Sequence, residues 1–442
     1  MKYIYTILLI SFSSITLNAQ QSYNMSLLGK LEYPIGLNDV WGYVDQLGNE
    51  YAIVGVINGT SIVDVSDPYN PVELFFIPGP SSTWRDMKTW GDYAYIVHDS
   101  FSNGESQGLL IIDLSDIENG NISSNSILSL SYSRFHNIYI DEKGVAYLFG
   151  GDYDNGGVLM YDLTVDPQAP IYLGEFEETY LHDGMVRGDT LWGSAVYNGL
   201  LMAIDVSDKS YPEIIGTVST PHNFTHNAWV SDDGKTVFTT DEVAGAYVAA
   251  VDVSDIANMT IVDQIQSYSP ETNVIPHNTH VYGEYLVTSY YCDGVTIVDA
   301  SNPTNLQEVA YYDTSDSTGG TFSGAWGAYP YLPSGNILVT DRQEGLHVLS
   351  IDNLDFSSED LESLLEIEIY PNPTTNYFTL TLDSESWDIL KVYDILGKLI
   401  ETQQNDNLIN SITLGDNWAT GTYILSVETK DNLRINYKLQ KQ

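Results

Sequence analysis

Short runs of apolar, β-branched and aromatic residues recur along most of this chain, and many of them end at an aspartate followed by a small polar turn. GTSIVDVSDP at 59–68 is the clearest example. The seven aspartates in this position lie 43 to 53 residues apart: Asp64, Asp113, Asp162, Asp205, Asp252, Asp299 and Asp352. This spacing indicates one supersecondary unit repeated along the chain, and a single unit of this size cannot bury its own faces.

Each period has the pattern of four short strands. Around 225–268, the runs THNAWVSD, TVFTTDE, GAYVAAVDVSD and TIVDQIQSY are separated by turn sequences. Seven such units predict an all-β fold, a seven-bladed β-propeller over residues 20–355. The recurrent aspartate is expected to accept backbone N–H groups in the turn that follows it, so we assign it a structural role.

The last unit, Trp326 to Asp352, has no fourth strand after it, because the acidic segment 356–367 follows. At the other end of the chain, MSLLGKLEYP at 25–34 is similar to outer strands such as EIIGTVSTP at 213–221. We therefore expect the N-terminal segment to complete the last unit and to close the ring, which would leave no open sheet edge between the two ends.

The string GTSIVDVSDPYNP at 59–71, followed by DYAYIVHD and a second such string, resembles the LVIVD repeat. That repeat belongs to the choice-of-anchor B family of bacterial exported proteins, and the resemblance covers roughly residues 25–355. It implies a β-propeller and a cell-surface setting, and it implies no particular activity.

Residues 1–19, MKYIYTILLISFSSITLNA, combine one lysine, an apolar run and small residues near the end, which is the pattern of an export signal peptide. No later segment is long and apolar enough to predict a transmembrane segment.

The composition changes after the linker at 356–367. Residues 20–367 hold 9 basic and 50 acidic side chains, whereas 368–442 hold 6 and 10, in alternating runs that predict a small antiparallel β-sandwich. PNP at 371–373, D-x-x-G-K at 394–398 and G-x-Y at 421–423 resemble the C-terminal type A sorting domain of the Bacteroidetes type IX secretion system. The resemblance implies the type IX secretion machinery as a partner, export across the outer membrane, and removal of the tail with surface attachment or release.

A formal net charge of −44 argues against nucleic acid and anionic lipid as partners and favours cations or basic molecules. A solubility adaptation of an exposed surface explains the same charge. Cys292 is the only cysteine, so the sequence excludes a disulfide within one chain and a zinc site made of thiolates.

Candidate chemistry lies where the innermost strands begin. Four consecutive units place a histidine followed by Asn or Asp at one register: His136, His182, His226 and His277. The other units place Trp41, Arg85 and Trp326 there. Loops expected on the same face carry Asp99, Asp152, Asp241, Asp293 and Asp341.

Three interpretations of this register stay open. The four histidines with Asp152, Asp241 and Asp293 would coordinate a divalent metal ion, or the histidines with Trp41, Trp326 and Arg85 would bind a polar ligand. Alternatively, each imidazole only bonds the backbone of the neighbouring unit. A further segment, GGDYDNGG at 150–157, resembles part of a calcium loop but lacks the later bidentate glutamate, and the sequence favours an ordinary tight turn there over a calcium site.

The chain contains no G-x-S-x-G elbow, P-loop, dinucleotide fingerprint or H-E-x-x-H segment. A fold alone does not settle function. The sequence favours a secreted or cell-surface scaffold that binds a polysaccharide, protein or small polar ligand. The alternatives are a metal-dependent hydrolase or lyase that uses a His/Asp rim, and a structural or adhesive surface protein.

Overall fold

The computed structural model describes most of the chain: residues 22–99, 108–127, 134–152, 155–269, 273–352, 367–382, 387–394, 399–405, 410–429 and 434–441. The expected signal peptide and all but the last residue of the expected acidic linker lie outside the described residues. So do Asp154 of the possible calcium loop and positions 395–398 of the D-x-x-G-K motif.

The described residues between 22 and 352 form seven antiparallel sheets. The first three contain β3 (Leu37–Val44), β4 (Glu50–Val56), β5 (Gly59–Asp64) and β6 (Val72–Pro78); β7 (Arg85–Trp90), β8 (Tyr93–His98), β9 (Leu109–Asp113) and β10 (Ser123–Ile127); and β11 (Asn137–Ile140), β12 (Val145–Phe149), β13 (Val158–Asp162) and β14 (Ile171–Phe176). The next two contain β15 (Asp183–Arg187), β16 (Thr190–Ala195), β17 (Leu200–Asp205) and β18 (Glu213–Ser219); and β19 (Thr225–Val230), β20 (Thr236–Asp241), β21 (Val248–Asp252) and β22 (Thr260–Ile265).

The last two of these sheets combine late and early segments of the chain. They contain β23 (Thr279–Tyr282), β24 (Tyr285–Ser289), β25 (Val295–Asp299), β26 (Gln307–Tyr312) and β1 (Ser22–Tyr23); and β27 (Ala325–Tyr329), β28 (Ile337–Asp341), β29 (Gly345–Ile351) and β2 (Met25–Leu31). Two short 3-10 turns, η1 (Ile117–Asn119) and η2 (Ile256–Asn258), follow the third strands of their sheets.

The first strand of each sheet contacts the first strand of the next sheet, and the sequence of contacts returns to its start. The order is β3, β7, β11, β15, β19, β23, β27 and again β3. Apolar residues fill the space between sheets, because the second and third strands are buried on both faces. One cluster joins three consecutive sheets through residues such as Leu201, Phe238 and Leu286.

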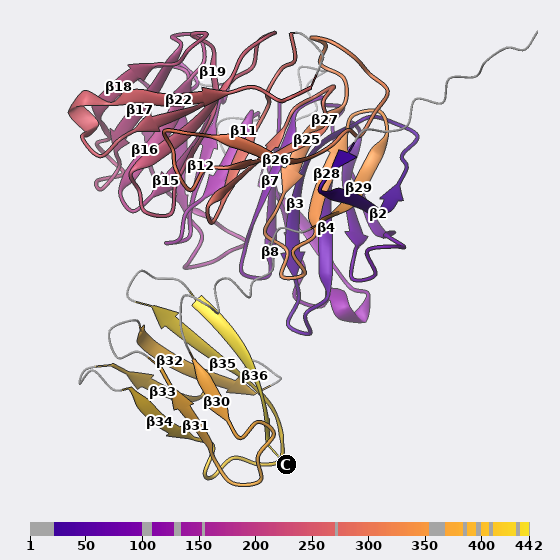
Figure 1. Cartoon of the computed structure of the whole chain (residues 1–442), viewed down its shortest axis with the longest axis vertical. Helices are drawn as coiled ribbons and strands as arrows, with labels where there is room; N and C mark the ends of the chain where they lie inside the picture. Colours follow the sequence, from indigo (N-terminus) through magenta and orange to yellow (C-terminus); the bar gives the residue numbers. More distant parts are fainter. Residues whose placement is uncertain are drawn as a thin grey trace, which may run out of the picture.

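Strand β2 joins the two ends of this part of the chain. Met25 pairs with Ile351 and Leu31 with Leu346, so β2 lies beside β29 (Figure 1). Two side-chain contacts reinforce the pairing: Ser26 Oγ donates to Asp352 Oδ2 at 2.6 Å, and Lys30 Nζ lies 2.7 Å from Glu344 Oε2. The described residues thus leave the outer edge of β29 covered by an N-terminal strand.

The structural role expected for the recurrent aspartates is confirmed in six units. Their carboxylates accept the backbone N–H two residues later at 2.8 to 3.0 Å: Asp64, Asp113, Asp162, Asp205, Asp252 and Asp299. The same local hydrogen bond therefore closes the turn after the third strand in each of these units.

The C-terminal strands form two antiparallel sheets. The first contains β30 (Glu368–Tyr370), β31 (Phe378–Thr381) and β34 (Ser411–Leu414), and the second contains β33 (Leu399–Gln404), β32 (Trp387–Asp394), β35 (Gly421–Thr429) and β36 (Arg434–Lys441). Both sheets contribute to one hydrophobic core, which includes Phe378, Leu390 and Leu425. Among the described residues, the prediction of a mainly β structure with several four-stranded antiparallel sheets is confirmed.

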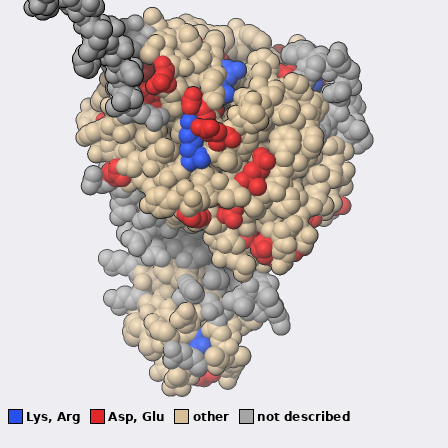
Figure 2. Space-filling model, turned by 90° about the vertical axis from the view of Figure 1, so that its right-hand side faces the viewer, with Lys and Arg blue, Asp and Glu red and all other residues tan. Residues whose placement is uncertain are grey.

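The face seen in Figure 2 carries acidic side chains scattered singly and in small groups, with few basic ones. The negative charge is therefore spread over this face and does not form one dense patch. Among the described residues, no helix is long and apolar enough to cross a membrane.

Candidate metal centre at the channel mouth

The four histidines of the aligned register lie around one small cavity where the inner strands begin. The cavity has about 20 Å³ of space for water-sized molecules, and its lining includes His136, His182, His226, His277, Trp326 and Arg85. These six residues come from six different sheets or the loops before them, so the circular arrangement of the inner strands brings them together. A cavity needs about 10 to 15 Å³ of such space to hold one water molecule.

The imidazole rings follow one another in a row. The ring centroids of His136 and His182 are 4.1 Å apart, those of His182 and His226 4.3 Å, and those of His226 and His277 4.7 Å. The indole of Trp326 continues the row 4.5 Å from His277. Neighbouring sheets therefore meet around this cavity through ring contacts, and we call this region the channel mouth.

Three of these imidazoles are fixed by the backbone of the next sheet. His182 Nδ1 lies 3.3 Å from the carbonyl oxygen of His226, His226 Nδ1 lies 3.2 Å from that of His277, and His277 Nδ1 lies 2.6 Å from that of Trp326. Because a carbonyl oxygen only accepts, each Nδ1 carries a proton, and Nε2 keeps its lone pair whenever the ring is neutral. The backbone contact expected for a structural histidine is thus present, and it also prepares Nε2 as a ligand.

Burial favours the neutral form of two of these rings. The pKa of His182 is held well below its usual range by burial and by the adjacent imidazoles. Burial and the neighbouring His226 lower the pKa of His277 in the same direction. A neutral imidazole is the form that coordinates a metal ion.

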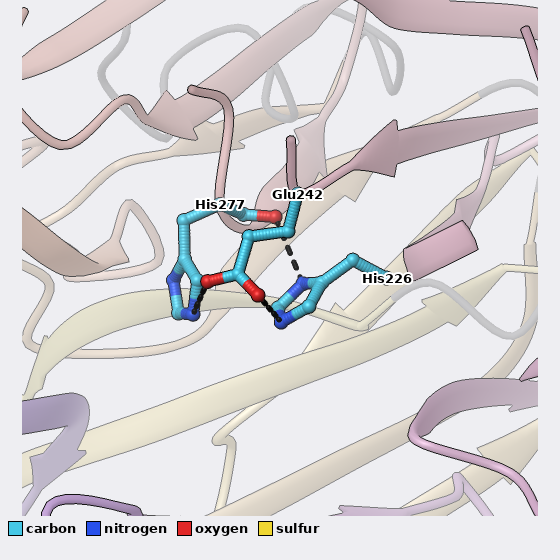
Figure 3. Close-up of side chains that lie close together, drawn as sticks. All are labelled: His226, Glu242 and His277. Carbon is cyan, nitrogen blue, oxygen red and sulfur yellow. Dashed lines mark hydrogen bonds and ion pairs between the residues drawn. The ribbon is translucent and has the colours of Figure 1, made fainter. Parts of the chain in front are cut away.

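Glu242 completes a group of three potential ligands with His226 and His277 (Figure 3). Its carboxylate points between the two rings: Oε2 lies 3.4 Å from His226 Nε2, and Oε1 lies 4.0 Å from His277 Nε2. All three ligand atoms lie within 4.8 Å of one another. Among the described residues, no other three His, Cys, Asp or Glu side chains form a group with this spacing.

When the two rings are neutral, the lone pairs on their Nε2 atoms face the carboxylate oxygens and repel them, so this arrangement suits a cation. Two ligands about 2.1 Å from a tetrahedral metal ion lie about 3.4 Å apart. The separation between His226 and Glu242 already has this value, and the wider separation to His277 would have to close around an ion.

Tyr291 orients Glu242. Its hydroxyl donates to Glu242 Oε1, and its ring lies 5.2 Å from that of His277. The backbone of Tyr291 has φ of 43°, which is unfavourable for a bulky side chain. Hydrogen bonds in both directions with Ala325 hold it there. Strained residues of this kind are concentrated at functional sites.

Arg85 lies on the wall of the same cavity and is almost fully buried, with 1% of its surface exposed. Its Nε donates to the carbonyl oxygen of Val56 at 3.2 Å and its Nη2 to that of Pro80 at 2.6 Å, whereas Nη1 has no hydrogen-bond partner in the part of the chain that the structure describes. Burial lowers the pKa of Arg85 to about 10.

A second polar layer lies below the histidines. Lys88 Nζ contacts Asp86 Oδ1 at 2.9 Å, and Asp183 accepts from Asn227 at 3.0 Å. Burial, followed by the nearby Asp86, raises the pKa of Asp39 well above its usual range. Several of these side chains bond the neighbouring inner strand, as Asn227 does with the N–H of Thr279 at 3.0 Å. This layer therefore links adjacent sheets.

The remaining candidates of the sequence analysis lie elsewhere. Trp41 does not line the cavity but packs against Tyr329 at 4.8 Å, with Lys88 Nζ 4.3 Å from its ring centroid. Asp152 pairs with Arg134 at 3.3 Å. Both carboxylate oxygens of Asp241 accept from the loop before β19, through the N–H groups of His222 and Phe224. Asp293 is buried in the turn that joins Tyr290 to Gly294.

Sequence alignment of the repeats selected Asp241 and missed its neighbour Glu242. Consecutive residues at the end of an extended strand point to opposite sides, so a shift of one position exchanges a loop contact for a site contact. The dipeptide Asp-Glu at the end of β20 was the available signal in the sequence. Which of its two side chains points to the site depends on how the loop leaves the strand. Tyr291 gave no signal, because its position follows from an unusual backbone angle.

Exposed aromatic side chains surround the mouth. Trp84 is 38% exposed and lies 6.0 Å from the ring of His136, and Phe322 is 52% exposed and lies 5.4 Å from that of Tyr291. Tyr197 is 78% exposed and contacts Tyr180, which in turn lies 6.4 Å from His182. Partly exposed aromatic rings of this kind are typical of binding surfaces.

Two family models match the chain. The LVIVD repeat matches residues 46–77, 195–220 and 277–314, and the secretion system C-terminal sorting domain matches residues 368–442. The chain carries LVIVD repeats and a type IX sorting domain. This domain directs the protein through the type IX secretion machinery to the cell surface or the medium, as the sequence motifs predicted.

Two curated relatives share short stretches with this chain. "Ulvan lyase NLR42" of Nonlabens ulvanivorans is 34% identical over 82 residues, 19% of this chain and 15% of that protein. "Endo-acting ulvan lyase" of Formosa agariphila is 25% identical over 138 residues, 29% of this chain and 26% of that protein. The chain thus spans about a quarter or less of the length of these relatives.

Among solved structures, the Pan2 WD40 domain of Neurospora crassa resembles this chain with a TM-score of 0.53 and 12% sequence identity. The match covers 75% of this chain and 97% of that domain. At this identity the likeness concerns the fold alone, and it identifies the repeated four-stranded sheets as propeller-like.

Proposed function

We propose that this protein is an exported seven-bladed β-propeller that binds a divalent transition metal ion at its channel mouth through His226, Glu242 and His277, and that it serves as a surface or secreted binding scaffold. The observation that carries this proposal is the approach of three ligand atoms to within 4.8 Å of one another. Two imidazoles and one carboxylate are a ligand set that suits zinc, manganese and iron.

The seven blades are supported by the seven sheets of the described residues 22–352 and by the closed circle of contacts between their first strands. The pairing of β2 with β29 supports closure of the ring by the N-terminal segment. We extend this propeller over residues 20–355, with the sorting domain at 368–442.

The size of the cavity favours binding over catalysis. About 20 Å³ accommodates an ion with a water molecule or one small group, but not a sugar ring. A larger ligand would therefore remain at the mouth, where Trp84, Tyr197 and Phe322 are exposed, and would reach the metal with a single polar group.

A titration of the mature protein with zinc tests the metal site. After treatment with a chelator, the wild-type protein should bind about one Zn²⁺ per chain in calorimetry, and Mn²⁺ more weakly. His226→Ala and Glu242→Gln should each lower the zinc affinity by about 100-fold or more, because each substitution removes a ligand.

His222→Ala is the matched control. His222 lies near the same sheet but stacks on Tyr247 at 5.4 Å, outside the three-ligand group, so its replacement should leave zinc binding unchanged. Equal zinc affinities for the wild type, His226→Ala and Glu242→Gln would refute the metal site.

A lyase or hydrolase that uses the same metal is the second candidate, and the short similarity to two ulvan lyases favours it. A lyase would release unsaturated fragments from ulvan, detected by ultraviolet absorbance, whereas a hydrolase would release fragments with new reducing ends and no added absorbance. His277→Ala should abolish the release. Intact ulvan after prolonged incubation would leave the binding scaffold as the function.

A further inference from the structure

Arg85 is a buried cation without an anionic partner. Arg85 lines the cavity, and both hydrogen bonds that its side chain makes to the described residues go to backbone carbonyl oxygens. Among the described residues, no carboxylate oxygen lies within 4.0 Å of it, although seven ion pairs of Lys or Arg with a carboxylate meet that distance elsewhere. A buried charge that lacks a counterion is costly to the folded state.

Nε and Nη2 of Arg85 already donate to backbone carbonyl oxygens, whereas Nη1 has no hydrogen-bond partner among the described residues. The N–H groups of Nη1 are therefore the donors left for a charge-assisted hydrogen bond to one oxygen of an anion. Nη1 is therefore ready to donate to an anionic group in the cavity.

The two carboxylates that line the cavity, Asp39 and Asp86, do not act as counterions of Arg85. Asp86 is compensated, because it accepts from Lys88 Nζ at 2.9 Å and from the N–H groups of Met87 at 2.6 Å and Ile138 at 3.3 Å. Asp39 accepts the N–H of Val40 at 2.8 Å and favours its protonated form. Neither carboxylate neutralises Arg85.

We infer that the Arg85 wall of this cavity is a subsite for one carboxylate group of a small polar ligand. The inference rests on the proposed function, since the ligand would approach between Arg85 and the metal centre formed by His226, Glu242 and His277. It also narrows that function, because the scaffold then recognises a molecule with a single carboxylate end rather than a polyanion. The small cavity and the net charge of −44 both disfavour a polyanionic chain.

Acetate is the probe for this subsite, and acetamide is the neutral probe of the same size. The mature protein should bind acetate in calorimetry both without metal and with zinc, and more tightly with zinc. Acetamide should bind at least about tenfold more weakly, because its neutral carbonyl oxygen accepts a hydrogen bond from Arg85 but cannot form an ion pair with it. Equal affinities for acetate and acetamide would overturn the inference.

Arg85→Gln should lower the acetate affinity about tenfold or more and leave zinc binding unchanged. Arg187→Gln is the matched control, because Arg187 ends β15 at the far end of an inner strand, where it contacts Ser231 and Asp232. It should bind acetate like the wild type. If Arg85→Gln bound acetate normally, the subsite would be wrong even if zinc bound as proposed.

A crystal of the wild-type protein soaked in acetate tests the subsite without requiring that a variant folds. Acetate within hydrogen-bond distance of Arg85 Nη1 is the expected result. An Arg85 that contacts only water at saturating acetate would overturn the inference, whereas a failure of the zinc titration alone would refute only the metal centre.

Discussion

Glycine follows tryptophan in two inner strands, β3 and β27, and in both places the neighbouring sheet leaves no room for a side chain. A Cβ atom at Gly42 would lie 2.1 Å from the ring of Tyr329, and one at Gly327 would lie 2.1 Å from Asp39 Oδ1. The two Trp-Gly pairs therefore record a close approach between the first and last sheets. Their tryptophans differ in surroundings, since Trp326 lines the cavity and Trp41 packs below it.

Glu308 gives a prediction at the residue scale. Burial raises its pKa from 4.5 to about 7, so the folded chain keeps a proton that the unfolded chain has lost. The carboxyl is therefore neutral in both states below pH 4.5, and it destabilises the fold increasingly as the pH rises to 7. Glu308→Gln should raise the free energy of unfolding by on the order of 2 kcal/mol at pH 8 and change it little at pH 4.

Urea denaturation at the two pH values measures this difference, with the exposed Glu284→Gln as the control. The amide oxygen introduced by Glu308→Gln could still accept the N–H of Tyr268, which Glu308 accepts at 3.1 Å. A stability change of the same size at pH 4 and pH 8 would show that ionisation of Glu308 is not the cause.

At the scale of elements, β2 connects segments that lie far apart in the sequence. It pairs along its length with β29, and it meets the first sheet closely, since a Cβ at Gly29 would lie 2.2 Å from the carbonyl oxygen of Pro68. β1, in contrast, adds only two residues to the edge of β26. The two N-terminal strands therefore differ in what they stabilise.

Deletion of residues 20–36 should lower the free energy of unfolding by on the order of 3 kcal/mol or more, because it exposes the edge of β29 and removes buried Met25. Deletion of residues 20–23 removes β1 alone and should cost much less. Thermal denaturation followed by circular dichroism compares both with the wild type. An unchanged melting temperature after the longer deletion would contradict closure of the ring by β2.

At the scale of the whole molecule, the proposed binding site and the sorting domain lie in different segments of the chain. The C-terminal sheets have a hydrophobic core of their own, which includes Trp387, Val392 and Val427, and the sorting-domain match coincides with them. The histidine cluster lies in the LVIVD-repeat part of the chain. Binding and export should therefore be separable.

Removal of residues 368–442 should leave a protein that folds and binds zinc but stays in the periplasm. Cell fractionation and surface labelling measure its location. The full-length His226→Ala variant is the complementary control, since it should reach the surface and bind zinc poorly. Normal surface display without residues 368–442 would contradict the role of the tail.

Much of the fold follows from local patterns in the sequence. The period of the apolar runs predicted the four-stranded units, and the Asp-x-Ser turns closed as expected because that hydrogen bond spans only two residues. The alignment of the units also selected six residues that line one cavity. It could not select Glu242 or Tyr291, whose directions depend on loops that differ between units.

The sequence by itself determined the repeated strands, the turns between them and the sorting tail, because each depends on contacts within a few residues. The tertiary structure alone decided which side chains meet at the mouth. His226, Glu242 and His277 come from separate segments, and the hydrogen bonds that fix their rings go to the backbone of the next sheet. No local pattern specifies such contacts, because they exist only once the sheets have packed side by side.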